Sequence, residues 1–496
     1  MAVKVDTQKE IIFGSSNPNI SRVISKKEKD GELRKLAPRI YTTNLIDSPA
    51  NIVRRNLIEI LAYRYPNALI SHRSAKEMRP TSTGDFFLTN STTRRVTDLP
   101  GIILNFVKGP KATAHDIPFM GMHISGEHRY MLENMQLSRK SGDESRVLPI
   151  SVIENKLEQL LLTGGEERLN QYRDELREVA NELGMADEFS KINNIISALL
   201  STHDARVLST DSAKARASGN PFDANRVGLF EILFDTIKDR YFVIRNNRNT
   251  DEDSFRVFSF FESYFSNYIE GTEFDIEEAK EIVDSGIPMP RRDEDSHDIL
   301  GTFKILSNRT EMRRVPTSPE ELFAILSHRH TILLEGRPHM NPGVFKMRNN
   351  RAGQTEFVDY QLVKGTLSQG FKYYSALTDP FARAIFMMFM ISEVHPFNDG
   401  NGRIARVMMN AEFVRADQSR IIVPTVFRED YILALRKLTR HKDPMAYINV
   451  MTKLHQFSDN LYGTDFTELK NYLAACNAYE EPSQAKLQII DRSIRH

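Results

Sequence analysis

The chain has 496 residues, 40% of them hydrophobic and 27% charged, so it is long enough for roughly two to four domains of ordinary globular composition. Its 66 lysines and arginines balance 66 aspartates and glutamates, which excludes a net field that would attract nucleic acid or a membrane surface. Any basic surface must therefore be local. The single cysteine, Cys476, excludes an internal disulfide framework and is typical of a reducing compartment.

The N-terminal stretch MAVKVDTQKE has no apolar segment of the kind found in a signal peptide. No uncharged apolar run in the sequence is long enough to span a bilayer. We therefore expect a cytoplasmic protein without membrane contact.

Basic residues are concentrated near the N-terminus, where the segment 21–40 holds seven lysines and arginines against three acidic residues. A short helix, a glycine turn and the stretch LRKLAPRIYTTN are typical of the recognition helix and wing of a winged helix-turn-helix. We expect residues 1–48 to form a domain of this kind, with DNA as a partner. An interaction domain that these charges only solvate is the alternative, because no second helix is obvious before Ile20.

Residues 49–150 combine strand and helix signals, which predicts an α+β region. FFLTN and GIILNFV are short β-like runs, bounded by turn residues at 83–85 and 100–101. Together with LISHRSA, these segments make the chain up to about Tyr130 resemble the AbiEi-type antitoxin regulators. The resemblance implies a regulator that binds DNA.

Residues 151–215 are expected to form a helical connector. VIENKLEQLLL and RDELREVANELG have helical periodicity and are ended by glycines. The stretch 209–226, STDSAKARASGNPFDANR, is rich in turn residues and predicts a linker.

Residues 227–454 are expected to form an all-α bundle, and residues 455–496 a helical tail. The stretch NPGVFKMRNNRAGQTEFVDY interrupts the helices and predicts a β-hairpin, with Asn349, Asn350 and Gly353 available for its turn.

Two histidine-containing spots do not predict a metal site. His328-Arg329-His330 lacks a third ligand at useful spacing, so we expect an exposed helix end there. The pair His297-Asp298 is by itself too little for a metal-dependent phosphohydrolase.

The most informative stretch is EVHPFNDGNGRIAR, residues 393–406. A helix is expected to begin at Asp379-Pro380 and, being apolar nearly all round, to be buried. It should end at His395-Pro396, because proline opposes a helical conformation in the preceding residue. A second helix should start near Asn401, so residues 397–402 form a loop that leads into a helix N-terminus.

Such a loop is suited to a phosphate. The N-terminus of a helix offers free N–H groups and a positive dipole, and Gly400 and Gly402 allow a ligand to come close. Arg403 and Arg406 lie three residues apart, hence on one face, and add cationic donors. Side chains of three other kinds complete the set: a candidate Mg²⁺ ligand, a candidate general base and a candidate core anchor, namely Asp399, His395 and Phe397. The set predicts phosphoryl or nucleotidyl transfer.

HPFNDGNGRIAR matches every defined position of the Fic-domain signature, His-Pro-Phe-x-(Asp/Glu)-Gly-Asn-Gly-Arg-x-x-Arg. The resemblance covers residues 254 to about 454 and implies transfer of AMP from ATP to a Ser, Thr or Tyr hydroxyl of a target protein. By motif position, it implies that His395 deprotonates the hydroxyl and that Asp399 binds Mg²⁺. It also implies phosphate contacts: the α- and β-phosphates with Gly400, Asn401 and Gly402, the β-phosphate with Arg403, and the γ-phosphate with Arg406.

The expected hairpin, about Gly343 to Tyr360, resembles the flap with which Fic proteins hold the target segment by strand addition. Its first residues are expected flap contacts: Gly343, Val344, Phe345 and Lys346. An ordinary exposed hairpin is the alternative.

Many Fic proteins carry an inhibitory motif, (Ser/Thr)-x-x-x-Glu-(Gly/Asn), and two segments match it. SNYIEG, Ser266 to Gly271, ends a helix with the apolar stripe Phe258, Phe261, Phe265 and Tyr268, whereas TILLEG, Thr331 to Gly336, runs into the expected flap. The family's inhibitory helix lies at the start of the domain, so the resemblance favours Glu270 over Glu335. Glu270 would pair with Arg406 and keep the ATP γ-phosphate out, with the inhibitory helix over about residues 254–271.

The sequence therefore predicts a protein adenylyltransferase that uses ATP and Mg²⁺ and is held inactive by Glu270 and Ser266. The alternatives are removal of AMP at the same site, transfer of another phosphate-containing group, and a DNA-binding regulator whose helical half only senses a nucleotide. The expected partners are a hydroxyl-bearing target protein and DNA, and the sequence also allows a homodimer.

Overall fold

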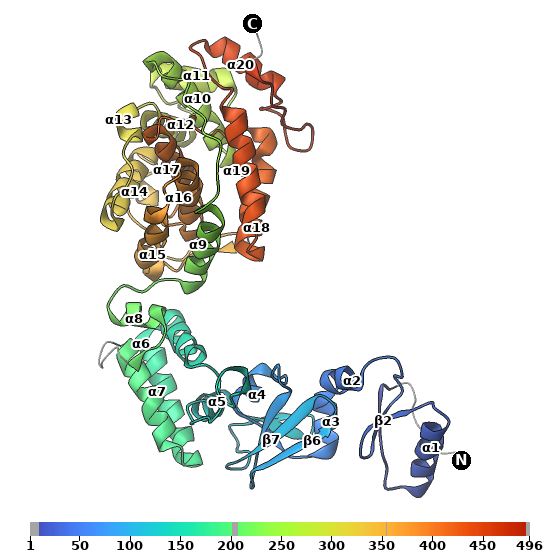
Figure 1. Cartoon of the computed structure of the whole chain (residues 1–496). Coiled ribbons are helices and arrows are strands. Elements are labelled where there is room, and N and C mark those ends of the chain that lie inside the picture. Colours follow the sequence, from blue (N-terminus) through green and yellow to red (C-terminus); the bar gives the residue numbers. More distant parts are fainter. Residues whose placement is uncertain (1–8, 201–206, 354, 493–496) are drawn as a thin grey trace. The chain divides into compact units, whose positions relative to one another are not determined.

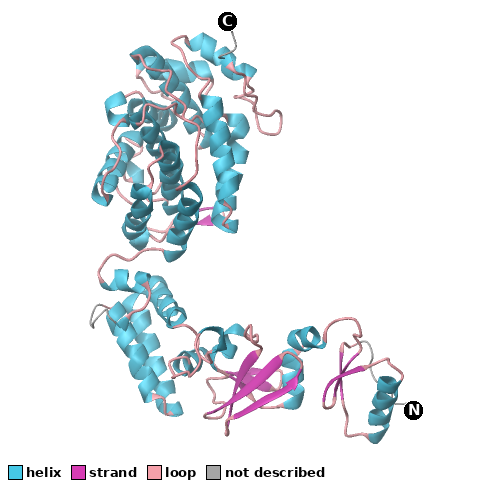
Figure 2. Ribbon diagram, in the orientation of Figure 1, coloured by secondary structure: helices cyan, strands magenta, loops and turns pink. Residues whose placement is uncertain are grey.

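The computed structural model describes residues 9–200, 207–353 and 355–492. The chain divides into two compact units, residues 1–218 and 219–496 (Figure 1). Strands are concentrated in the first unit and helices dominate the second (Figure 2). The expected multidomain fold, with an N-terminal α+β region and a C-terminal helical bundle that carries a β-hairpin, is confirmed.

A small antiparallel sheet and one helix begin the first unit. They are β1 (Ile11–Phe13), α1 (Pro18–Lys29), β2 (Arg34–Ala37) and β3 (Ile40–Thr42), with strand order β1-β3-β2. Asn17 caps α1 by accepting a hydrogen bond from the Asn19 N–H, and Pro18 occupies the first turn. Within residues 9–48, α1 is the single helix. The segment thus contains the helix and hairpin expected of a winged helix, without a preceding helix.

A six-stranded mixed sheet follows, with strand order β6-β7-β5-β4-β9-β8. Its strands are β4 (Leu69–Ile70), β5 (Asp85–Asn90), β6 (Arg94–Leu99), β7 (Ile102–Lys108), β8 (Ile117–Phe119) and β9 (Met122–Ile124). The two runs that the sequence predicts as strands are β5 and β7, which lie side by side in parallel. β6 joins them in sequence and pairs antiparallel with β7.

Short helices accompany this sheet: α2 (Pro49–Arg55), α3 (Leu57–Arg64), α4 (His72–Glu77) and α5 (Glu127–Glu133). Apolar residues of α2 and α3 share one buried cluster with side chains of the sheet, among them Ile52, Ile60, Phe86, Leu104 and Phe106.

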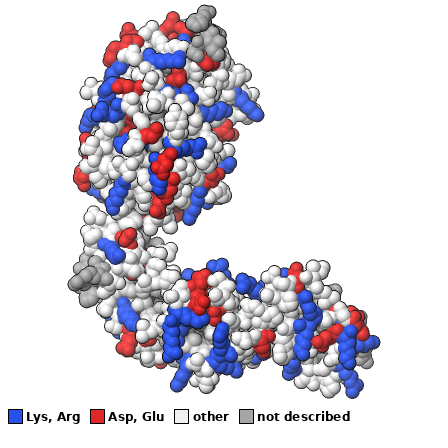
Figure 3. All heavy atoms as spheres, viewed as in Figure 1, with Lys and Arg blue, Asp and Glu red and all other residues white. Residues whose placement is uncertain are grey.

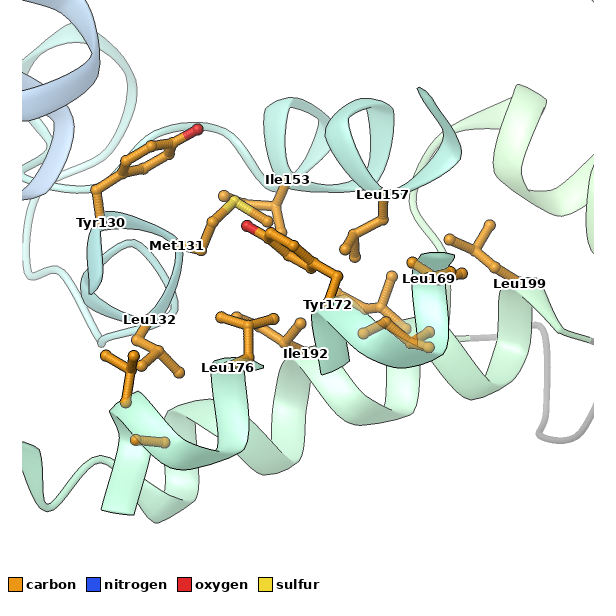
Figure 4. Packing of buried hydrophobic residues seen from close by; sticks show 14 of the residues in the cluster. Tyr130, Met131, Leu132, Ile153, Leu157, Leu169, Tyr172, Leu176, Ile192 and Leu199 are labelled. Carbon is orange, nitrogen blue, oxygen red and sulfur yellow. The ribbon is translucent and has the colours of Figure 1, made fainter. Parts of the chain in front are cut away.

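The first unit ends in three helices, α6 (Ile150–Leu183), α7 (Ala186–Leu199) and α8 (Asp211–Ala217). The two glycine boundaries expected in this region are present: Gly165 interrupts α6 with a φ of 66°, and Gly184 ends it in the left-handed conformation. Side chains from α5, α6 and α7 pack into one apolar core, with Tyr172 near its centre (Figure 4). The expected linker over 209–226 contains the boundary between the two units, but part of it is helical, because Thr210 caps α8 within it.

The second unit is a helical bundle. Its helices are α9 (Ala224–Ile237), α10 (Glu252–Ile269), α11 (Ile276–Ser285), α12 (Asp293–Leu306), α13 (Arg309–Met312), α14 (Pro319–Leu333), α15 (Val363–Ala376), α16 (Pro380–Val394), α17 (Asn401–Arg415), α18 (Arg428–His441), α19 (Pro444–Ser458) and α20 (Phe466–Ala475). α16 is buried along nearly its whole length, as its apolar sequence predicts, and it lies among the other helices in Figure 1.

The hairpin consists of β10 (Arg351–Ala352) and β11 (Thr355–Glu356), with Gly353 in the turn at a φ of 58°. Asn349 and Asn350 precede β10, so their expected place in the turn is wrong. Their side chains instead hold the base of the hairpin: Asn349 donates to Asp359, and Asn350 donates to the carbonyl of Phe397. In the described parts of the chain, no helix is both long and apolar enough to cross a membrane.

Candidate functional site

The loop between α16 and α17 begins where the sequence predicts. Asp379 accepts a hydrogen bond from the Ala382 N–H and caps α16, which ends at Val394. His395 adopts a left-handed conformation with a φ of 52°, and Pro396 follows. This conformation costs a non-glycine residue about 1–2 kcal/mol, so the surrounding contacts must hold His395 there.

Asn401 closes this loop onto itself. Its Oδ1 accepts a hydrogen bond of 2.8 Å from the Phe397 N–H, and its Nδ2 donates to the Phe397 carbonyl at 2.9 Å. Phe397 is fully buried, as expected of a core anchor. The side-chain amide of Asn401 is thus used within the loop, which leaves backbone N–H groups as the donors that this position can offer a phosphate.

His330, on α14, contacts and supports the same loop. Its ring stacks on Phe397 with 3.7 Å between centroids, its Nε2 lies 3.0 Å from the carbonyl of Asp399, and its Nδ1 accepts from the Gly343 N–H at 2.8 Å. A carbonyl can only accept, so Nε2 carries the proton. Burial lowers the pKa of His330 to about 4, which keeps the ring neutral.

The expected exposure at 328–330 holds for His328, whose side chain is 51% exposed, but is wrong for the next two residues. Arg329 and His330 are both fully buried, and Arg329 is paired with Glu311 at 2.9 Å. The helical spacing of the sequence could have predicted the burial of His330, because this residue follows the buried Leu326 by four positions and precedes the buried Leu333 by three.

His395 is placed as a proton acceptor. Its Nδ1 lies 3.3 Å from the Ser392 carbonyl, so Nδ1 carries the proton and Nε2 has a free lone pair. The ring stacks on Phe357, just after β11, with 3.6 Å between centroids. Burial lowers the pKa of His395 to about 4, so the neutral, basic form dominates at neutral pH.

The N-terminus of α17 lies where the sequence predicts an anion site, and a carboxylate of the chain itself lies against it. Gly400 precedes the helix with a φ of 71°. A Cβ at Gly402 would collide with Oε1 of Glu270. The carboxylate at the end of α10 thus lies against the first turn of α17, where a phosphate would bind.

Glu270 and Ser266 also hold Arg406. Arg406 Nη2 lies 2.7 Å from Glu270 Oε1, Nε donates to Ser266 Oγ at 3.0 Å, and Nη2 donates to the Ser266 carbonyl at 2.8 Å. Burial raises the pKa of Glu270, but the charge and hydrogen bonds of Arg406 outweigh it, so the pKa is lowered overall. The ionised pair is therefore the stable form.

Glu335, the other candidate inhibitory glutamate, lies away from the motif loop. The side chain of Glu335 is 66% exposed and pairs with Lys304 at 3.3 Å, beyond the end of α14. The structure therefore brings Glu270, and not Glu335, to the motif.

Arg403, the other motif arginine, is paired with Asp298 on α12 at 2.7 Å. Sequence analysis missed Asp298 as a site residue. The residue lies four positions before the buried Thr302 and seven before the buried Ile305, which places it on the inner face of α12.

The residues expected to begin the flap form an irregular segment under the hairpin. Lys346 donates through its backbone N–H to the Pro396 carbonyl at 2.8 Å and through Nζ to Asn350 at 2.7 Å. Burial lowers the pKa of Lys346 to about 8. Phe345 packs on Phe397, Gly343 turns the chain with a φ of 80°, and Val344 is half exposed. This segment ties the hairpin to the motif loop.

Arg226, which sequence analysis also missed, ties the other strand to α16. It pairs with Glu393, two residues before His395, at 2.5 Å, and donates to the Glu356 carbonyl in β11 at 2.6 Å.

Asp399 is the candidate metal ligand of the site. Its Oδ1 accepts from the Gly400 N–H at 2.7 Å, Oδ2 lies 3.6 Å from Arg403 Nη2, and the side chain is 39% exposed. No cluster of three or more His, Cys, Asp or Glu side chains able to hold a metal occurs among the described residues. A single accessible carboxylate fits Mg²⁺ that takes its other ligands from phosphates and water.

Comparison with known proteins agrees with this geometry. Residues 318–412 match the Fic/DOC family. This part of the chain is therefore similar to a Fic/DOC domain. The match ends within α17 and includes α14, the hairpin, α16 and the motif loop.

The related proteins with this domain include protein adenylyltransferases. The chain is 30% identical over 115 residues to protein adenylyltransferase fic-1 of Caenorhabditis elegans, which covers 23% of the chain and 22% of that protein. It is 24% identical over 214 residues to protein adenylyltransferase Fic of Nematostella vectensis, which covers 40% and 47%. The chain thus spans less than half the length of these relatives. A solved structure of Fic-1 from C. elegans aligns with a TM-score of 0.36 at 16% identity, over 66% of the chain and 92% of that structure.

Proposed function

We propose that this Fic/DOC protein is an adenylyltransferase that moves AMP from ATP to a hydroxyl side chain of a target protein. The observation that carries the proposal is the placement of a neutral, basic His395 beside a helix N-terminus that has two arginines on its first turns. The relatives named as protein adenylyltransferases support the choice of AMP as the transferred group.

Each residue of the site has its own role in the proposed transfer. Nε2 of His395 accepts the proton of the target hydroxyl, whose oxygen forms a bond to the α-phosphorus while the bond from that phosphorus to the pyrophosphate oxygen breaks. The N–H groups at the start of α17 neutralise charge that develops on the phosphate oxygens. Arg403 contacts the β-phosphate and Arg406 the γ-phosphate. The products are the AMP ester and pyrophosphate, and the proton stays on His395.

Asp399 would hold Mg²⁺ at the rim of this site, where the ion would neutralise phosphate charge. The exposed edge of its carboxylate and its place beside Gly400 fit that role.

The target segment would lie along the hairpin. Arg351, Ala352 and Glu356 are exposed, so the short strands leave backbone groups for a further strand. A cavity of about 690 Å³ beside the hairpin is lined by Val344, Phe345 and Lys364, among other residues, and offers room for a target side chain.

The same proposal includes autoinhibition by Glu270. Glu270 competes with a γ-phosphate for Arg406 and with the other phosphates for the first turn of α17. ATP would then bind with its α-phosphate misplaced for in-line attack, which slows transfer without abolishing nucleotide binding.

Incubation of the Glu270→Gly variant with cell extract and α-labelled ATP tests the proposal. We expect labelled protein bands whose mass rises by one AMP at a Ser, Thr or Tyr. Label from γ-labelled ATP would instead indicate transfer of another phosphate-containing group. Loss of AMP from a target that is already modified, with no forward labelling, would indicate that removal of AMP is the main reaction.

A second candidate function, DNA binding, is supported by the face of α1. Arg22, Lys26 and Lys29 are exposed, and their spacing places them on one face of this helix with Ser25. Figure 3 shows basic side chains at this end of the chain, with acidic side chains between them. Salt-dependent binding to a DNA duplex is the measurement that tests it.

A further inference from the structure

Asp298 connects Arg403 to a second arginine that is not part of the motif. Its carboxylate lies 2.7 Å from Arg403 Nη1 and 2.8 Å from Arg337 Nη2, and the Nε of Arg337 lies 3.1 Å from both of its oxygens. The side chains of Asp298 and Arg403 are 2% and 3% exposed. One buried carboxylate is thus shared by two guanidinium groups.

We propose that Asp298 is a positioning residue that holds Arg403 ready for the β-phosphate of the nucleotide. This inference rests on the proposed function, because it concerns the nucleotide of that same site. It assigns to Asp298 a role opposite to that of Glu270, although each carboxylate is paired with a motif arginine.

The donors of Arg403 support this role. Asp298 takes up Nη1, whereas Nε is buried and has no hydrogen-bond partner in the described part of the chain. Nη2 lies 3.6 Å from a carboxylate oxygen of Asp399. A buried donor without a partner is costly, so Nε favours an acceptor. A β-phosphate oxygen can fill that place while Asp298 keeps its contact.

The position of Asp298 distinguishes it from a brake. Glu270 lies at the end of α10, is 33% exposed and lies against Gly402, where it occupies the space that a phosphate would take. Asp298 lies within α12, is almost inaccessible and is held from two sides. Removing it from Arg403 would leave buried charges unpaired, which opposes a switching motion.

Arg337 completes the arrangement. It also pairs with Glu294 at 3.1 Å and with Asp295 at 3.4 Å, both on α12. The acidic face of α12 therefore fixes Arg337, Arg337 helps to fix Asp298, and Asp298 fixes Arg403. The orientation of Arg403 is set before a nucleotide arrives, which lowers the entropy lost on binding.

Calorimetric titration with ADP and with AMP tests the inference, in the Glu270→Gly variant so that the site is open. ADP carries the β-phosphate and AMP does not. We expect Asp298→Asn and Asp298→Ala to weaken ADP binding about 10- to 100-fold, the range for loss of a hydrogen bond to a charged group. AMP binding should stay within about twofold.

Two matched variants sharpen the test. Glu311→Gln removes another buried carboxylate that is paired with an arginine, away from the motif, and should leave the ADP-to-AMP ratio unchanged. In an Arg403→Ala background, Asp298→Asn should cause no further loss of ADP affinity, because its effect acts through Arg403.

Other outcomes would overturn the inference. Equal losses for ADP and AMP would show a purely structural role, and tighter ADP binding would show a second brake. Unchanged ADP binding would show that Arg403 needs no support. If the Glu270→Gly parent bound neither nucleotide, the proposed function itself would fail, and the inference with it.

Discussion

Arg406 donates a hydrogen bond of 2.7 Å to the carboxylate of Glu270, a residue 136 positions earlier in the chain. Ser266 accepts from the Nε of the same arginine and, through its carbonyl, from Nη2. Both donor groups are thus held by the last turn of α10. The contact joins the end of α10 to α17, the helix that would bind phosphate.

The first prediction concerns release of this contact. Glu270→Gly should raise AMP transfer to target, or to the protein itself, by about 100-fold, because a misplacement of about 1 Å can cost that much in rate. Ser266→Ala should raise it less, since it removes one hydrogen bond to Arg406 and leaves the carboxylate in place. Transfer from α-labelled ATP measures both.

Glu335→Gly is the matched control for Glu270→Gly, because the same kind of change is made at a surface ion pair away from the motif. It should leave transfer unchanged. Activation by Glu335→Gly alone would identify the other segment as the brake, and activation by neither would show that the chain has no brake of this kind.

The second prediction concerns the base. His395→Ala should lower transfer about 10²- to 10⁴-fold, the usual contribution of a positioned general base, while ATP affinity stays nearly the same. The double variant Glu270→Gly with His395→Ala should show no AMP transfer, because removing the inhibitory carboxylate does not supply a base. Full transfer by the alanine variant would remove His395 from the mechanism.

The third prediction is the pH dependence of transfer. Burial lowers the pKa of His395 to about 4, so the imidazole stays neutral and basic down to that pH. In the Glu270→Gly variant, kcat/KM should therefore show no acid limb near pH 6.5, the ordinary value for histidine. A limb near pH 6.5 would show that the ring is solvated when the enzyme turns over.

The fourth prediction is the pH dependence of stability. The pKa of His330 is about 4 in the folded protein and about 6.5 in the unfolded chain. Between these values the unfolded chain binds more protons, so stability falls as the pH drops from about 6.5 to 4. The full shift corresponds to about 3 kcal/mol.

Urea unfolding at several pH values from 4.5 to 7.5 checks this sign. His330→Gln should be less stable at pH 7.5, since it loses the stack on Phe397, but its stability should fall less steeply toward acid. His395 and His455 also have lowered pKa values and remain in the variant, so part of the slope should persist. An unchanged slope would contradict the neutral state of His330.

The fifth prediction separates the two units. Changing Arg22, Lys26 and Lys29 together to Ala should weaken DNA binding and flatten its salt dependence, without an effect on AMP transfer. Arg403→Ala should weaken productive ATP binding and leave DNA affinity unchanged. If the wild-type protein binds no duplex in a salt-dependent way, the basic face of α1 serves a protein partner instead.

Local sequence predicted the motif loop closely, because its main features depend on neighbouring residues. The Asp379 cap, the end of α16 at the residue before Pro396 and the start of α17 at Asn401 are all set by interactions within a few positions. The same holds for Gly165 and Gly184, where the backbone needs glycine. The strands β5 and β7 were also evident from their own composition.

Features that depend on packing were missed or wrong. His330 looks polar and exposed in sequence, yet it is buried under the motif loop because α14 lies against Phe397. Asn349 and Asn350 have the composition of a turn, but they are used at the base of the hairpin, where Phe397 and Asp359 lie within reach. The segment 209–226 has linker composition, and α8 forms there beside carboxylates of α6.

The sequence by itself determined the chemistry of the site: the histidine, the helix N-terminus, the glycines and the arginines lie within twelve residues, so their order along the chain nearly defines their geometry. It also supplied two glutamates that match the inhibitory motif, and the resemblance favoured Glu270 by its place at the start of the domain. Only the tertiary structure brings Glu270 to Arg406, and only it revealed Asp298, His330 and Arg226 as neighbours of the motif. The physical reason is that an ion pair or a buried hydrogen bond depends on distance in space, and residues from 69 to 167 positions apart are brought to about 3 Å only by the packing of the helices between them.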